Sequence, residues 1–227
     1  MTADRTGLAD IGLKTIVDLR TDTEREGAPD PQFPGVTELA LDVLADTTSI
    51  ALPANIAELL ADPAVVAQMS AELTVDKAHS LMASTYRDFV TLDSAKRGFG
   101  DFYTGLLDGG RTPALFHCTN GKDRTGWAAA TFLSLMGVRT EDVYRDYLLT
   151  NDRLLPAMQP MVDRFTAAGG DRRLLLPLLG VDTAYLDAAF DQVRVEYGTL
   201  ERYFGEALGV DAEAQRELRS RFLVTPV

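Results

Sequence analysis

Short runs of apolar, β-branched residues near the start of the chain predict strands. Residues 14–20, with the sequence KTIVDLR, form an apolar run bounded by polar residues, as in a buried strand. Glycines and prolines from residue 27 to residue 35 predict a loop, and residues 36–42 then alternate apolar and polar positions like a second strand. A third apolar run, residues 113–116, leads directly into His117. The first half of the chain therefore supplies two or three strands.

Apolar residues at helical spacing occupy most of the remaining chain. Before residue 140 they predict four helices: residues 53–71 with a break near Pro63, 76–92, 99–107 and 126–136. From Thr140 onward the whole pattern is helical, with Asp182 and Thr199 as N-cap residues. Glycines mark the turns between these later helices: Gly169, Gly170, Gly180, Gly198 and Gly209.

The length and composition fit one globular domain. The chain has 227 residues, of which 46% are hydrophobic and 25% charged, values ordinary for a folded protein with its own core. Strands that come early and helices that dominate later predict an α/β fold. We expect a single domain over residues 1–227, with a central sheet, flanking helices and a helical C-terminal half.

The formal net charge of −12 disfavours nucleic acid and anionic membranes as partners. Any anionic ligand must therefore meet a positive potential that is local to its site. No apolar run reaches the length of a transmembrane helix, and residues 1–10 lack the apolar core of a signal peptide. We expect no stable membrane insertion and a cytoplasmic location, while export without an N-terminal signal stays an alternative.

The chain has one cysteine, Cys118, which excludes an intramolecular disulfide. A lone cysteine fits a reducing compartment or a catalytic thiol. Two histidines and one cysteine cannot build a common zinc site. We therefore expect no metal and no other cofactor.

The candidate chemistry lies in residues 117–126, HCTNGKDRTG, which we call the signature loop. It connects a predicted strand to an apolar helix, so its backbone N–H groups and the helix N-terminus can bind the oxygens of a phosphate monoester. Gly121 supplies a backbone conformation that a side chain would hinder, and Gly126 lets the helix approach the sheet. The planar guanidinium of Arg124 can bind two phosphate oxygens. The same positive field favours the thiolate of Cys118, the expected nucleophile.

The signature loop has the form HCxxGxxRTG and resembles the signature of protein tyrosine phosphatases. The pair Lys122-Asp123 makes it similar to a bacterial tyrosine phosphatase-like branch of that family with mycobacterial members. The similarity runs from Gly12 to Leu223. Further matches are VDLR at residues 17–20 with Glu24, GV at 137–138, DYLL at 146–149, and YG before YF in residues 197–204.

This resemblance implies a central sheet of mostly parallel strands and hydrolysis of phosphate monoesters through a phospho-Cys118 intermediate. Substrates would be phosphotyrosine proteins, phosphoserine or phosphothreonine proteins, or phosphoinositides. The resemblance also implies a helical lid over residues 152–180, although the apolar side chains there would equally suit a core. Members of the branch usually begin with a further strand region, which this chain is expected to lack.

The resemblance implies roles for the signature loop as well. The phosphate would contact Thr119, Asn120, Gly121, Lys122 and Thr125. The Thr125 hydroxyl can donate to the thiolate and later help it leave the phosphorylated intermediate. For Lys122 the alternative is an exposed, solvated side chain. His117 is expected to be structural.

A general acid is needed to protonate the leaving oxygen. In this branch the natural candidate is Asp123, whose alternative role is to stabilise the helix N-terminus. Asp42, after the second predicted strand, is the alternative acid, and Asp46 is a weaker candidate. We expect Asp18, Arg20 and Glu24 to form an ion-pair network that supports the loop, and His79 to lie on a surface helix.

Two other classes of function remain as alternatives. A phosphatase-like module could bind phosphorylated partners without turning them over, although it would have no need to keep Cys118, Asp123 and Arg124 together. Sulfur transfer or arsenate reduction also uses a cysteine loop. Rhodanese-type loops lack the GKDRTG sequence, however, and arsenate reductases of this chemistry normally recruit further cysteines, which this chain lacks.

Overall fold

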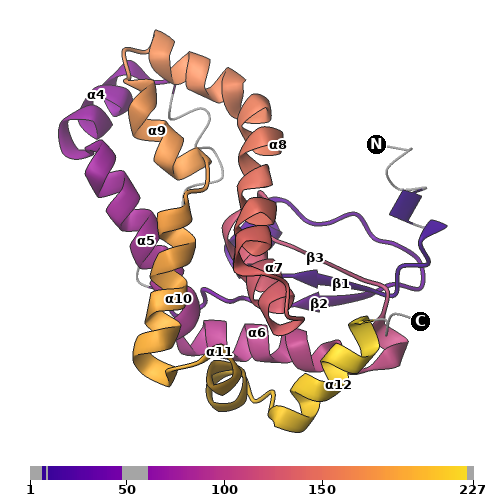
Figure 1. The fold of residues 1–227 in the computed structure, drawn as a ribbon. Coiled ribbons are helices and arrows are strands. Elements are labelled where there is room, and N and C mark those ends of the chain that lie inside the picture. Colours follow the sequence, from indigo (N-terminus) through magenta and orange to yellow (C-terminus); the bar gives the residue numbers. More distant parts are fainter. Residues whose placement is uncertain (1–6, 9, 48–60, 224–227) are drawn as a thin grey trace.

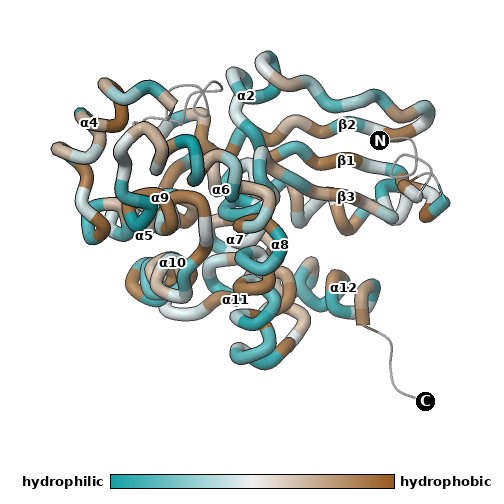
Figure 2. The backbone as a smooth tube through the Cα atoms, turned by 90° about the horizontal axis from the view of Figure 1, so that it is seen from above, coloured by the Kyte–Doolittle hydropathy of each residue, from teal (hydrophilic) through white to brown (hydrophobic). Residues whose placement is uncertain are grey.

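Three parallel strands form the sheet in this computed structural model, which describes residues 7, 8, 10–47 and 61–223. The strands are β1 (Thr15–Asp18), β2 (Thr37–Ala40) and β3 (Ala114–His117), in the order β2-β1-β3, and Figure 2 shows them side by side. Each of the three predicted strands is therefore confirmed, and all pair in parallel, as the predicted fold class requires.

The register of the sheet sets the position of the candidate site. Asp18, the last residue of β1, lies opposite Ala40 of β2 and His117 of β3. Because the strands are parallel, the segments that follow them leave from the same edge of the sheet. The signature loop, the segment after Asp18 and the segment after Ala40 therefore meet at this edge.

Helices make up most of the remaining described chain (Figure 1). Their bounds are α2 (Asp22–Gly27), α4 (Pro63–Glu72), α5 (Val75–Thr91), α6 (Asp93–Gly105), α7 (Asp123–Leu135), α8 (Thr140–Ala167), α9 (Arg172–Leu179), α10 (Thr183–Tyr197), α11 (Leu200–Arg202) and α12 (Ala212–Phe222), with a 3-10 turn at Gly109–Arg111 and a π-helical turn at Tyr203–Ala207. The helical C-terminal half is thus confirmed.

Several helix ends differ from those predicted. Pro63 is the first residue of α4, where a missing N–H costs nothing, and the part of that predicted helix before residue 61 lies outside the described residues. The helix α6 begins at Asp93, six residues before its predicted start at Phe99. The predicted N-caps are confirmed: Asp182 accepts a hydrogen bond from Ala184 and Thr199 accepts one from Arg202.

The apolar side chains form two clusters. The larger packs α5, α6, α7, α10 and the sheet together around Trp127, Tyr86 and Phe99. The smaller joins α4, α8 and α9 around Phe165, with Val66, Val162, Leu175 and Leu179. In Figure 1, α4, α9 and the adjoining end of α8 extend as a lobe away from the sheet. Residues 152–180 thus form a helical hairpin, and Val162, Phe165, Leu175 and Leu179 of that hairpin are buried in the smaller cluster.

Candidate active site

Cys118 directly follows β3, at the edge of the sheet where the three strands end. Its side chain is buried, and the Thr125 hydroxyl donates to Cys118 Sγ over 3.2 Å. Residues 119–121 are exposed, and Gly121 has a φ of +62°, which a side chain would strain. The helix α7 begins at Asp123 and directs its N-terminus at this loop. This is the strand, loop and helix arrangement that the sequence predicted.

Glu24 holds Arg124 in place with two hydrogen bonds. Arg124 Nη1 donates to Glu24 Oε2 over 2.6 Å, and Nη2 donates to Oε1 over 2.7 Å. Nη2 also lies 3.3 Å from the Thr119 hydroxyl oxygen. Nη1 donates in addition to the Leu19 carbonyl oxygen over 3.4 Å, so among the described residues only Nε–H of the five N–H groups has no partner and stays available for an anion. Glu24 therefore orients the arginine and leaves it capacity to bind phosphate.

The charge states of this pair are fixed by the contact. Burial would raise the pKa of Glu24, but the hydrogen bonds from Arg124 and Thr119 outweigh burial and lower that pKa to about 2. Burial likewise opposes the charge of Arg124, and the Glu24 hydrogen bonds outweigh it, so the pKa of Arg124 is raised. Both groups are therefore ionised at neutral pH. The sequence predicted Glu24 in a network with Asp18 and Arg20, and did not identify its bond to Arg124.

Asp123, the proposed acid, is partly exposed and has two neighbours on one oxygen. The Tyr86 hydroxyl donates to Asp123 Oδ1 over 3.1 Å, and Lys122 Nζ lies 3.2 Å from the same atom. The side chain keeps 24% of its surface accessible. A carboxyl group in this loop, with one oxygen anchored and part of its surface open, can give a proton to a bound substrate.

Lys122 is buried, so the alternative of an exposed, solvated lysine is wrong. Only 3% of its surface is accessible. Its Nζ donates to the carbonyl oxygens of Leu178, at 2.8 Å, and Gly180, at 2.9 Å. These carbonyls lie where α9 ends, so the ammonium ties the signature loop to the base of the α8–α9 hairpin.

Asp42 and Asp46 follow β2 and bond to backbone and hydroxyl donors. Asp42 accepts from the backbone N–H groups of Asp22, at 3.2 Å, and Leu44, at 2.9 Å. Asp46 accepts from the Ser94 N–H over 3.1 Å and from its hydroxyl, and these bonds lower the pKa of Asp46. Asp46 thereby caps α6. Asp42 stays an alternative acid, because it follows a strand that ends at the edge from which the signature loop leaves.

A second ion-pair network lies behind the loop. Arg20 Nη2 is 2.7 Å from Asp18 Oδ2 and 2.9 Å from Asp30 Oδ1, and His117 Nε2 is 2.9 Å from Asp30 Oδ2. Asp18, Asp30 and His117 are also the one described group whose ligand atoms cluster as a metal site would require. A cation there would have to displace the Arg20 guanidinium. The network therefore supports the ends of β1 and β3.

Gly126 and His79 make contacts other than those predicted from the sequence. A Cβ on Gly126 would lie 3.1 Å from ring carbons of Tyr147 in α8, so this glycine admits that ring and not, as predicted, the sheet. His79 is half-buried, with its Nδ1 2.9 Å from the Tyr185 hydroxyl.

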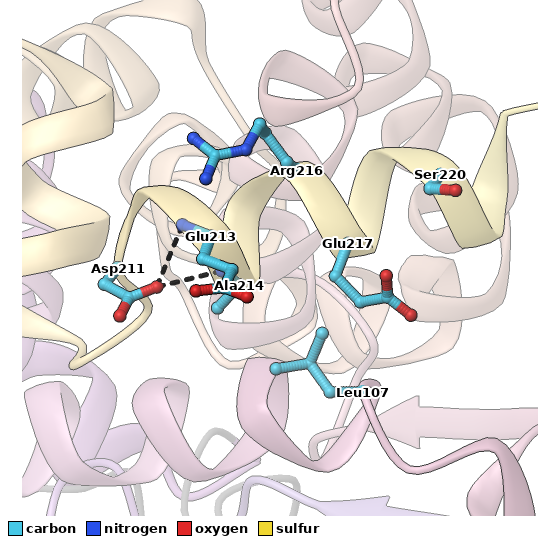
Figure 3. A pocket seen from close by; sticks show the side chains of 7 residues that line it. All are labelled: Leu107, Asp211, Glu213, Ala214, Arg216, Glu217 and Ser220. Carbon is cyan, nitrogen blue, oxygen red and sulfur yellow. Dashed lines mark hydrogen bonds between the residues drawn. The ribbon is translucent and has the colours of Figure 1, made fainter.

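A separate surface hollow lies along α12, as Figure 3 shows, where Asp211 caps the helix. No residue of the signature loop lines this hollow.

A buried cysteine after a parallel strand, with a loop arginine and a helix N-terminus beside it, is typical of cysteine-dependent phosphatases. A profile of the tyrosine phosphatase family matches residues 1–224, and the chain belongs to this family, whose members are phosphoric monoester hydrolases.

Individual relatives agree with this family. The chain is 33% identical over 231 residues to a Cupriavidus necator protein named provisionally as a tyrosine-protein phosphatase, covering 97% of this chain and 74% of the relative. It is 34% identical over 163 residues to the triple specificity protein phosphatase PtpB of Mycobacterium tuberculosis, covering 65% of this chain and 56% of PtpB. A tyrosine-protein phosphatase of Nostoc commune is 28% identical over 148 residues, covering 65% of this chain and 44% of that relative.

Among the described helices, none is both long enough and apolar enough to cross a bilayer.

Proposed function

We propose that this chain hydrolyses phosphate monoesters through a phospho-Cys118 intermediate. The observation that carries the proposal is the contact of Cys118 Sγ with the Thr125 hydroxyl at the start of α7, beside an arginine oriented by Glu24. The hydroxyl and the helix N-terminus both stabilise a thiolate. The thiolate attacks phosphorus while the P–O bond to the leaving group breaks. Water then attacks the phospho-cysteine, which releases phosphate and restores the thiolate.

The phosphate oxygens would bind the backbone N–H groups of the signature loop and the guanidinium of Arg124. Thr119, Asn120 and Gly121 are exposed and would form the open side of this cradle. Lys122 would contribute through its backbone N–H, because its ammonium is bonded to the carbonyls of α9. The Thr125 hydroxyl would stabilise the sulfur as it leaves phosphorus.

The substrate class we propose is a phosphotyrosine protein, with phosphoserine, phosphothreonine or a phosphoinositide as further substrates. The name of the mycobacterial relative, a triple specificity phosphatase, supports this breadth. The α8–α9 hairpin is proposed as a lid, which its attachment to Lys122 at the loop supports. A reducing compartment such as the cytoplasm suits the free Cys118 thiol, because oxidation would end its role as nucleophile.

The nucleophile is tested with Cys118→Ser in EDTA and a reductant. Wild-type protein is expected to release phosphate from para-nitrophenyl phosphate, and the variant to lose about a thousandfold or more in kcat. The variant should still bind inorganic phosphate, which shows that the loop is intact. Activity that persists in Cys118→Ser would exclude a phospho-Cys118 intermediate. Wild-type protein that binds a phosphotyrosine peptide without releasing phosphate would select the binding-module alternative.

The acid is tested with Asp123→Asn and Asp42→Asn. A general acid matters most for a poor leaving group, so Asp123→Asn is expected to lower kcat by about a hundredfold on phenyl phosphate and far less on para-nitrophenyl phosphate. Asp42→Asn should change kcat by the same factor on both substrates. The reverse pattern would assign the acid to Asp42.

A further inference from the structure

Two buried tyrosine hydroxyls lie directly behind the proposed acid. Tyr86 of α5 is fully buried, and 3% of Tyr147 of α8 is accessible. Their hydroxyl oxygens are 2.6 Å apart, and the Tyr86 hydroxyl reaches Asp123 Oδ1. A buried hydroxyl needs a partner, and these two satisfy one another and the aspartate.

The direction of this chain of hydrogen bonds follows from the number of hydrogens. Tyr86 has one hydroxyl hydrogen, and Oδ1 of an ionised Asp123 can only accept. Tyr86 therefore donates to Asp123, and its oxygen accepts from Tyr147. Burial, reinforced by the charge of Asp123, raises the pKa of Tyr86 well above its usual range, and burial raises that of Tyr147. Both tyrosines therefore remain neutral donors at physiological pH.

Oδ1 of Asp123 faces two donors, because Lys122 Nζ lies near the same atom as the Tyr86 hydroxyl. A proton on Oδ1 would point at those donors, so the proton of the acid form belongs on Oδ2. We propose that Tyr86 is a positioning residue that holds Oδ1 of Asp123 and thereby presents Oδ2 to the leaving-group oxygen. This inference rests on the proposed role of Asp123 as general acid.

The signature glycine has a part in this arrangement. A Cβ on Gly126 would come within 3.1 Å of the ring of Tyr147, closer than most real contacts. The absence of a side chain at Gly126 thus allows Tyr147 to reach Tyr86. The last glycine of the motif therefore supports the acid through two tyrosines.

The test is Tyr86→Phe, which keeps the ring and removes the donor. We expect kcat on phenyl phosphate to fall about tenfold, the value of a hydrogen bond to a charged group, with a smaller loss on para-nitrophenyl phosphate and little change in KM. Tyr103→Phe is the matched control. Its hydroxyl is as buried and bonds Ala128 and Thr131 of α7 instead of Asp123, so Tyr103→Phe should change kcat by the same factor on both substrates.

Asp123→Asn in the same series separates two kinds of failure. If Asp123→Asn has no leaving-group preference, the acid assignment is wrong. If it has that preference and Tyr86→Phe does not, the role of Tyr86 is overturned. The double variant should be no more leaving-group dependent than Asp123→Asn alone, because Tyr86 acts through Asp123; additive losses would also overturn the proposal.

Should Tyr86→Phe fail to fold, Tyr147→Phe provides the second variant. It keeps the Tyr86 donor and removes the bond that orients it. The expected loss has the same leaving-group dependence and is smaller. An equal loss on both substrates would contradict the proposal.

Discussion

At the scale of single residues, the orientation of Arg124 depends on a partner one hundred positions earlier in the chain. Glu24 is itself fixed by a capping box: the Thr21 N–H donates to Glu24 Oε2 over 2.9 Å, and Thr21 accepts from the Glu24 N–H. The short helix α2 thus serves to hold one carboxylate against the guanidinium.

Glu24→Gln is expected to weaken both substrate binding and turnover. The amide cannot hold the guanidinium in its fork as a charged bidentate partner, so we expect kcat/KM on para-nitrophenyl phosphate to fall about tenfold. Glu26→Gln, an exposed position on the same helix, is the control and should leave kcat/KM unchanged. Wild-type kcat/KM in Glu24→Gln would show that Arg124 needs no such partner.

The ion pair of Glu24 with Arg124 is expected to make the stability of the fold depend on pH. The folded-state pKa of Glu24, about 2, lies below its ordinary value of 4.5. The ion pair therefore stabilises the fold fully above about pH 4.5 and is lost as the pH falls towards 2. In urea unfolding, the free energy of unfolding of the wild type should exceed that of Glu24→Gln by about 2 kcal/mol at pH 7. This difference should shrink below pH 4.5. A difference that does not change with pH would contradict this assignment.

The local part of the site could be predicted from the sequence and the distant part could not. Cys118, Thr125 and Arg124 stand in one short loop, so their spacing alone indicates the chemistry. Tyr86 and Asp123 are 37 positions apart in the sequence, and Tyr86 and Tyr147 are 61 positions apart. A buried tyrosine at helical spacing looks like any other core residue, and only the packing of α5 against α7 and α8 reveals its partner.

At the scale of elements, the pattern of apolar residues predicted the three strands and the long helices but missed the short helix α2. The strands β1 and β3 and the helix α5 follow from their apolar runs. The helix α2 has six residues and no buried side chain, so it carries no periodic signal. Its capping box was the available sequence sign, because Thr and Glu stand three positions apart.

The burial of Lys122 shows the same limit for a charged residue. The burial of this side chain could not be predicted from the signature loop, because the two carbonyl oxygens that accept its hydrogen bonds belong to residues 56 and 58 positions later. Asn151 of α8 reinforces that junction: it donates to the carbonyl and accepts from the N–H of Val181, both at 2.8 Å. The end of α9 is therefore held from the loop and from α8.

At the scale of the whole molecule, the separate apolar clusters indicate two units of stability. Cys118, the candidate nucleophile, belongs to the larger cluster, while α4, the outer part of α8 and α9 share the smaller one. Lys122 and Asn151 join the two at the α9–α10 junction. Such a lobe can open with a lower free energy than the rest of the protein.

Phe165→Ala tests this division. Phe165 is fully buried in the smaller cluster and packs on Gly170, so its loss should cost that cluster about 3 kcal/mol. Native-state hydrogen exchange is expected to accelerate in α4, the outer part of α8 and α9, while amides of α5 to α7 keep their protection. Phe99→Ala, in the larger cluster, should instead accelerate exchange throughout the protein. Equal acceleration of all helices by Phe165→Ala would mean that the two clusters unfold as one, and the hairpin would then be unsuited to move as a lid.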